Sequence, residues 1–130
     1  MTLAPTSRYL VCIESSAATL DASQIWEWVR SIATEMVEAI IGDLGSRGRG
    51  EAILLVNGFG ATPLSELYLM YDAIRGLLEP AGTIVTRSLV GNFVTSLDMA
   101  GCSATVSMLD EETKQLWDAP VYTAALRWGV

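Results

Sequence analysis

The sequence predicts an α/β domain, with a layered sheet built through right-handed β-α-β crossovers. Two observations carry this prediction. Apolar runs of strand length alternate along the chain with two long stretches whose apolar residues recur at helical spacing. In addition, 51% of the 130 residues are hydrophobic and only 18% are charged, which supplies a folded core and excludes intrinsic disorder. We therefore expect residues 1–130 to form a single α/β domain.

The first predicted elements are a short strand and a long amphipathic helix. The apolar, partly β-branched run Tyr9–Ile13 predicts the strand. Asp21 or Ser23 suits the N-cap of the following helix, because both side chains accept hydrogen bonds from backbone amides. Apolar residues then recur at helical spacing from Ile25 to Leu44, and Gly45 follows as a typical helix terminator.

The middle of the chain predicts a strand, a turn and a second helix. Ala52–Val56 is a continuous apolar run, as expected of a strand that is covered on both faces. Thr62 is predicted to cap the next helix with Pro63 at its first position, where the missing N–H costs nothing. The predicted buried stripe of this helix, which ends before Pro80, consists of Leu64, Leu67, Tyr68, Tyr71, Ile74, Leu77 and Leu78.

The last part of the chain predicts two more strands and two short helices. The strand candidates are Thr83–Val90 and Thr105–Leu109, with a short helix over Ser96–Ala100 between them. Residues 110–112 are acidic and suit the first turn of another short helix, where their charges favour the helix dipole. The C-terminal aromatic residues predict an extended segment that packs onto the domain or a partner; they are Trp117, Tyr122 and Trp128.

Composition and motifs exclude several classes of function. The net charge is −7 and the eight basic residues are scattered, which argues against a nucleic-acid partner. Cys12 and Cys102 are unpatterned, so no zinc site is expected, and catalysis by a triad with histidine is excluded because the sequence has no histidine. No apolar stretch reaches the length of a membrane span and no secretory signal pattern opens the chain, so we expect a cytoplasmic protein.

The turn between the middle strand and helix is the first candidate site. Gly58, Gly60 and Thr62 lie where open α/β sheets place ligands, and amides at a helix start can hold an anion. The turn matches neither the P-loop nor the dinucleotide-binding fingerprint, so the alternative is a tight turn whose glycines serve the backbone only. Asp98 is the second candidate, as a base, a magnesium ligand or an interface residue. Because it has no acidic partner in the sequence, a cap or surface role is favoured.

Four segments occur in order and indicate a family. They are LLVNGFGATPLSELY (residues 54–68), RSLVGN (87–92), TSLDMAG (95–101) and LWDAPVY (116–122). Together they resemble the C-terminal end of the substrate-binding K subunit or domain of dihydroxyacetone (glycerone) kinase. The resemblance is close over about residues 50–130, weaker through residues 36–44 and lost over residues 1–24. It implies a fold equivalent to the second half of the K domain.

The same resemblance implies a phosphotransferase activity with parts that this sequence lacks. The family transfers a phosphoryl group to dihydroxyacetone from ATP or a phosphoprotein relay, and a histidine in a Gly-Ile-His-Gly-Glu motif holds the ketone. Residues 12–16 do not match that motif, and Tyr122 stands where the family has a second histidine. No catalytic, cofactor or metal residue is therefore carried over to this sequence. ATP and magnesium are expected on a separate L-type partner.

Two hypotheses follow from the resemblance. In the first, the chain is a C-terminal K portion that contributes scaffold to the kinase when the missing half complements it. Such a portion is expected to form a homo-oligomer, to pair with the complementary half or to meet an L-type subunit, because surfaces normally packed on that half are exposed. In the second, the chain is a non-catalytic regulatory or binding paralogue. In either case the chain alone is expected to be inactive.

Overall fold

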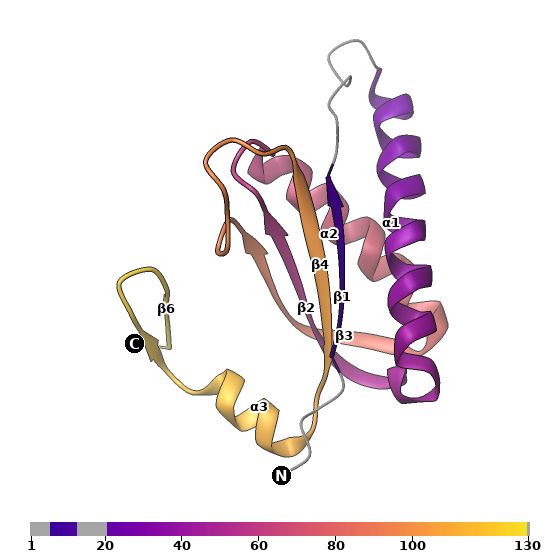
Figure 1. Ribbon diagram of the computed structural model, residues 1–130. Coiled ribbons are helices and arrows are strands. Elements are labelled where there is room, and N and C mark those ends of the chain that lie inside the picture. The colour runs from indigo at the N-terminus through magenta and orange to yellow at the C-terminus, as the bar shows by residue number, and fades with distance from the viewer. Residues whose placement is uncertain (1–5, 13–20, 130) are drawn as a thin grey trace.

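The computed structural model describes residues 6–12 and 21–129, and its centre is a four-stranded mixed sheet (Figure 1). The strand order is β1-β4-β2-β3, with β2 and β3 parallel and β4 antiparallel to both β1 and β2. The strands are β1 (Thr6–Cys12), β2 (Gly50–Gly58), β3 (Thr83–Gly91) and β4 (Gly101–Met108). The α/β prediction is thus confirmed in its coarse form, although the sheet is mixed because a loop and not a helix connects β3 to β4.

Two long helices, α1 (Ala22–Leu44) and α2 (Leu64–Leu78), cover one face of the sheet (Figure 1). Asp21 caps α1 as predicted. Its carboxylate accepts hydrogen bonds from the amides of Ser23 and Gln24, and the Gln24 side chain accepts one from the Asp21 amide. Gly45 ends α1 with φ of 56°, and its amide donates to the Ile41 carbonyl.

The predicted cap of α2 is wrong. Pro63 is the N-cap residue, and the Thr62 hydroxyl instead donates to the Gly101 carbonyl at 3.0 Å and accepts from the Gly101 amide at 2.8 Å. This pairing is buried and satisfies a donor and an acceptor at once, whereas a cap would satisfy only one amide.

The buried side of α2 also differs in part from the predicted stripe. Leu64 and Tyr68 are exposed, whereas Met70 and Ala73 are buried. The remaining predicted positions are buried or partly buried. The helix ends at Leu78 and continues as a short 3₁₀ turn, η3 (Glu79–Ala81); a similar turn, η2 (Gly45–Gly48), follows α1.

The core lies between the two helices and the sheet. Its fully buried large side chains come from both helices and from β2 and β4; they include Met36, Ile40, Leu44, Leu54, Leu67, Ile74, Leu78, Val56 and Val106. Successive residues of a strand point to opposite faces, so Leu54 and Val56 of β2 meet the helices and Ile53 and Asn57 lie on the second face. Both of the latter are buried, whereas Leu55, between them on the same face, is only partly buried.

The predicted helix over residues 96–100 is absent. Residues 92–100 form an irregular connection, the β3–β4 loop, and β4 begins at Gly101, before the predicted Thr105. Side-chain hydrogen bonds from Asn57 and Ser96 hold the loop backbone, and such bonds compete with the helical ladder. At the other end of the chain, the predicted strand at Tyr9–Ile13 is β1, although Ile13 lies outside the described residues.

The C-terminal segment stands away from the sheet on the side opposite α1 (Figure 1). It consists of α3 (Glu111–Asp118), capped by Asp110, and a small hairpin of β5 (Val121–Tyr122) and β6 (Arg127–Trp128). The rings of Trp117 and Trp128 pack 5.3 Å apart. Two ion pairs join α3 to the sheet, one between Lys114 and Glu51 and one between Asp118 and Arg87. No helix of the described residues is long and apolar enough to cross a membrane.

Candidate functional site

The parallel strands β2 and β3 end side by side, and a buried amide side chain joins their ends. Asn57 Oδ1 accepts hydrogen bonds from the amides of Phe93 at 2.9 Å and Val94 at 2.8 Å. Its Nδ2 donates to the carbonyls of Val94 at 2.8 Å and Gly58 at 3.2 Å. Asn57 is only 4% exposed, so this side chain fixes the β3–β4 loop from inside the sheet.

The turn after β2 requires glycine at one position in particular. Gly60 has φ of +112°, a conformation that other residues rarely adopt. A Cβ atom built at Gly60 would lie 2.7 Å from the Ser96 carbonyl oxygen, closer than real contacts allow. The glycine therefore lets the backbone of the turn approach the β3–β4 loop directly.

Two amides of this turn donate to backbone carbonyls of the facing segment. Phe59 donates to the Gly101 carbonyl at 3.3 Å, and Ala61 donates to the Met99 carbonyl at 3.2 Å. The Ser96 hydroxyl donates to the Phe59 carbonyl at 2.7 Å, and so completes a network between the turn and the β3–β4 loop. These two amides are therefore not available to an anion.

The predicted site residues divide into two groups. Gly58, Gly60 and Thr62 come together in one hydrogen-bonded turn at the end of β2. Asp98 lies in the facing β3–β4 loop, where it is exposed and forms no hydrogen bond or ion pair with another described residue. The structure therefore places all four at the same end of the sheet but leaves the Asp98 carboxylate outside the network.

The described residues supply little covalent or metal chemistry. Burial raises the pKa of the Cys102 thiol to about 11, so it is protonated and unreactive at neutral pH. No group of three or more His, Cys, Asp and Glu side chains in the described part of the chain could hold a metal ion. At this end of the sheet, the side chains of Asn57, Thr62 and Ser96 form hydrogen bonds with backbone groups.

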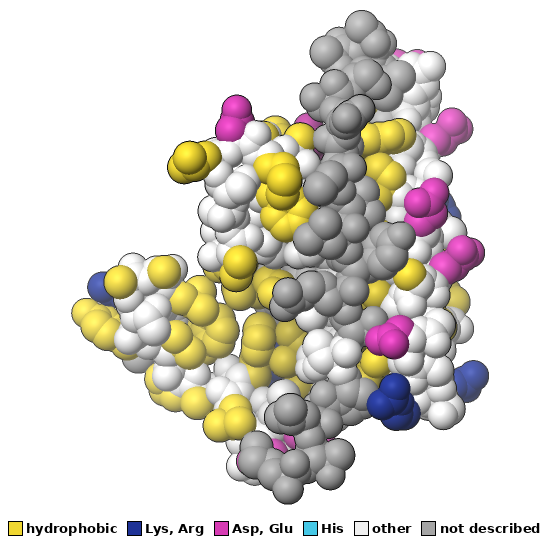
Figure 2. Space-filling view, in the orientation of Figure 1, with side chains coloured by type: hydrophobic (Ala, Val, Ile, Leu, Met, Phe, Trp, Pro, Cys, Tyr) yellow, Lys and Arg dark blue, Asp and Glu magenta, His cyan; other side chains and the backbone are white. Residues whose placement is uncertain are grey.

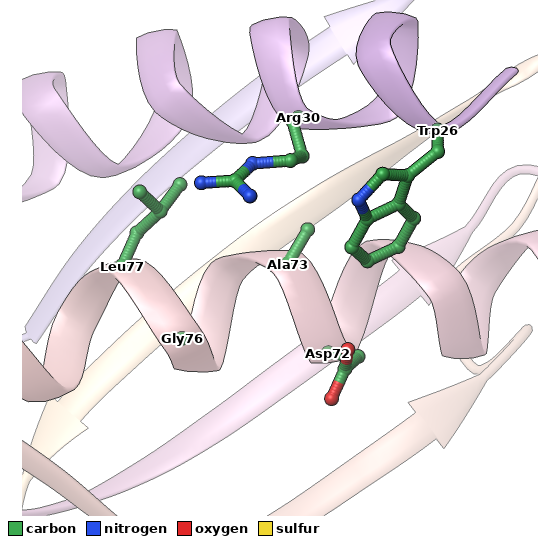
Figure 3. A pocket seen from close by; sticks show the side chains of 6 residues that line it. All are labelled: Trp26, Arg30, Asp72, Ala73, Gly76 and Leu77. Carbon is green, nitrogen blue, oxygen red and sulfur yellow. The ribbon is translucent and has the colours of Figure 1, made fainter. Parts of the chain in front are cut away.

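A separate pocket of about 210 Å³ lies between the two long helices (Figure 3). Trp26 and Arg30 extend into it from α1, and α2 supplies the opposite wall with Asp72, Ala73, Gly76 and Leu77. The Arg30 guanidinium extends over α2 toward Leu77, whereas the Asp72 carboxylate points away from it, and the two form no ion pair. The pocket is open to solvent and lies on the helical layer, away from the strand ends.

Two features were not predicted from the sequence, the side chain of Asn57 and the α1–α2 pocket. Asn57 carried a usable signal, because it is a polar residue at the end of an otherwise apolar strand and directly precedes a glycine turn. The pocket carried none. Trp26 and Asp72 belong to different helices, and only the packing of α1 on α2 brings them together.

Comparison with known proteins identifies the family. The Dak1 domain matches residues 19–125, which include both long helices, the glycine turn and the β3–β4 loop. The chain belongs to the Dak1 domain family. The predicted resemblance to the K-type subunit of dihydroxyacetone kinase is thereby confirmed.

Relatives of this Dak1 domain include several ketose kinases. Over 77 residues it is 53% identical to the dihydroxyacetone-binding subunit of the PEP-dependent dihydroxyacetone kinase of Escherichia coli, which covers 59% of this chain and 22% of the relative. Over 88 residues it is 48% identical to an L-erythrulose 1-kinase of Mycolicibacterium smegmatis, which covers 68% of this chain and 15% of the relative. The chain therefore spans about a fifth or less of these two proteins.

A solved structure shows the same fold in a protein with another role. A dihydroxyacetone kinase operon co-activator superposes with a TM-score of 0.66 at 35% identity, covering 71% of this Dak1 domain and 29% of the co-activator. A second structure, described as concerning regulation of the dha operon of Lactococcus lactis, superposes with a TM-score of 0.70 at 34% identity. That match covers 75% of this chain and 32% of the other. The co-activator thus shares the mixed sheet and its helices with this chain, and the kinase relatives share its sequence.

Proposed function

We propose that this Dak1 domain is the C-terminal portion of a dihydroxyacetone kinase K subunit and that it contributes scaffold to phosphoryl transfer onto dihydroxyacetone. The observation that carries the proposal is the 53% identity to the E. coli dihydroxyacetone-binding subunit. The turn at the end of β2 supports the proposal, because its hydrogen bonds join it to Ser96 of the β3–β4 loop and to Gly101 at the start of β4. On this proposal the domain corresponds to the second half of the K fold.

The chemistry of the reaction belongs to other parts of the enzyme in this proposal. The 130 residues contain no histidine to hold a ketone, and the buried Cys102 thiol is protonated. ATP and magnesium bind to an L-type subunit, and the complementary K half supplies the substrate-binding residues. The domain works in the cytoplasm, as one copy of an oligomer or as the partner of that half.

The four candidate residues then have structural and contact roles. Gly58, Gly60 and Thr62 shape the turn that receives the β3–β4 loop. Asp98, exposed on that loop, meets a partner. None of the four acts on the substrate.

A second function, in regulation, is favoured by one observation. The superposition on a dihydroxyacetone kinase operon co-activator, at a TM-score of 0.66, shows that this fold serves a protein named for co-activation. In this alternative the domain binds a regulatory partner and takes no part in phosphoryl transfer.

Co-purification with an L-type subunit, followed by a kinase assay, separates the two functions. We expect the domain to bind the L-type subunit and to support ATP-dependent phosphorylation of dihydroxyacetone only when the complementary K half is added. The domain alone serves as the negative control, and the complete E. coli subunit serves as the positive control. Binding without activity in the complemented mixture would favour the regulatory function.

A further inference from the structure

The α1–α2 pocket is hollow because small residues of α2 face it. Its volume is about 210 Å³, with Trp26 and Arg30 of α1 on one side and Ala73 and Gly76 of α2 on the other (Figure 3). A Cβ atom built at Gly76 would meet no other atom within 4 Å. No close contact from the described residues therefore requires glycine here, and the missing side chain leaves the pocket open.

Arg30 supplies this pocket with a cation that has no protein partner. Its guanidinium extends over α2 toward Leu77, and it forms no hydrogen bond or ion pair with any side chain in the described part of the chain. The Asp72 carboxylate points away from it (Figure 3). An arginine guanidinium binds a carboxylate through two parallel N–H donors. The group that best complements Arg30 in the pocket is therefore a carboxylate.

Trp26 gives the pocket a flat apolar wall. The indole is partly buried against the core, and its ring points toward α2 (Figure 3). Trp26 and Arg30 are four residues apart in α1, so they lie on the same side of the helix, one turn from each other. A ligand that places a carboxylate on Arg30 thus brings the group attached to that carboxylate beside the indole, where a planar ring stacks favourably.

The size and the charge of the surroundings narrow the class of ligand. Pockets for drug-sized ligands span about 300–1,000 Å³, so this smaller pocket suits a single ring. The neighbouring Arg75 is paired with Glu79 at 3.0 Å, and exposed acidic side chains such as Glu35 and Glu38 project along α1 (Figure 2). These charges do not attract a bare anion, so contact with the ring has to add to the contact with Arg30.

We propose that the α1–α2 pocket binds a small planar aromatic carboxylate of the benzoate class. The carboxylate accepts two hydrogen bonds from the Arg30 guanidinium, and the ring lies over Ala73 and Gly76 against the indole of Trp26. The pocket belongs to the helical layer and shares no residue with the glycine turn at the end of β2. Binding here is therefore separate from the proposed function, and its test does not depend on a kinase assay.

The test titrates the full 130-residue chain with benzoate and follows it by NMR. Saturable shifts are expected for the Trp26 indole N–H and for the amides of residues 73–77, with a dissociation constant of about 1 mM, as suits a ligand of so few atoms. Acetate carries the charge without the ring, and benzamide carries the ring without the charge. Each is expected to bind at least about tenfold more weakly than benzoate, because it keeps only one of the two contacts.

Two matched pairs of variants locate the site. Arg30→Gln is expected to weaken benzoate binding by about tenfold or more, whereas Arg47→Gln removes the same charge in η2 and leaves binding unchanged. Gly76→Leu fills the space above α2 and is expected to abolish the shifts. Gly42→Leu makes the same substitution on α1, outside the pocket, where a Cβ atom also meets nothing within 4 Å. Circular dichroism of each variant confirms that it is folded.

Several results would overturn the proposal. Benzoate that causes no saturable shift of the Trp26 indole does not bind in the pocket. Equal binding by Arg30→Gln would show that Arg30 does not hold the carboxylate, and an equal loss in Arg47→Gln would show that benzoate responds to net charge alone. If acetate binds as tightly as benzoate, the pocket is a general anion contact; if benzamide does, the charge plays no part. None of these results changes the expectation for the kinase assay.

Discussion

Replacing Asn57 with alanine removes the side chain that joins the ends of β2 and β3. The change deletes four hydrogen bonds, to the amides of Phe93 and Val94 and to the carbonyls of Val94 and Gly58. Each such bond contributes about 0.5–1.5 kcal/mol net to stability. Because water reaches part of the loop, we take the lower half of that sum and expect the free energy of unfolding to fall by about 2–4 kcal/mol.

Urea unfolding and hydrogen exchange measure this effect together. The first gives the loss of free energy, and the second is expected to show faster exchange of the Phe93 and Val94 amides, which lose their acceptor. Asn92→Ala is the control, because Asn92 is an exposed asparagine of the same loop. A loss below about 0.5 kcal/mol with unchanged exchange of both amides would refute the role given to Asn57, since exposed substitutions reach only that size.

Three further predictions concern single residues. Gly60→Ala is expected to lower the free energy of unfolding by about 1–3 kcal/mol through backbone strain. Gly76→Ala is expected to raise it by about 0.5–1 kcal/mol, because Gly76 lies inside α2 and a Cβ atom there would meet no other atom within 4 Å. Thermal unfolding of the two variants compares these effects. Cys102 is expected to resist iodoacetamide at pH 8 in the native protein and to react in denaturant, as peptide mass spectrometry will show. The hydrogen bond from Arg87 lowers the pKa of the Asp118 carboxyl. The ion pair between these two residues therefore contributes fully to the docking of α3 above about pH 4, the ordinary aspartate range. This contribution is lost as pH falls through the lowered pKa. NMR of the C-terminal indoles follows this release, and in Asp118→Asn it should be present already at pH 7.

The helices and strands that residues close together in the sequence determine were predicted from local sequence patterns. Asp21 and Gly45 bound α1 because a cap and a terminator act within a few residues of the helix end. The strands β2 and β3 were predicted because each is a run of mostly apolar residues that are neighbours in the sequence. The strand order was not predictable from these runs, because the insertion of β4 between β1 and β2 is decided by long-range pairing.

The candidate site shows the same division. The glycine turn was found from residues 58–62, since glycines and a proline signal a turn directly. The partner of Thr62, the Gly101 backbone, is 39 residues away in sequence, so a local rule assigned the hydroxyl to the nearest helix instead. Asn57 and the loop that it holds are likewise far apart in sequence, and a helix was therefore wrongly predicted at Ser96–Ala100.

The two ion pairs between α3 and the sheet were also not predictable from the sequence. Lys114 reaches Glu51 and Asp118 reaches Arg87, and both partners lie on strands that precede α3 by many residues. The C-terminal tail was predicted to be an extended segment that packs its aromatic residues onto the domain or a partner. This part of the chain instead forms α3 and a hairpin, and Trp117 of α3 packs against Trp128 within the same segment.

The central claim is that this Dak1 domain is scaffold and does not itself hold the ketone. Calorimetric titration of the purified 130-residue chain with dihydroxyacetone tests it most directly, with the complete E. coli dihydroxyacetone-binding subunit titrated in parallel. We predict saturable heat for the E. coli subunit and none for this chain. Stoichiometric binding of dihydroxyacetone by the chain alone would contradict the claim.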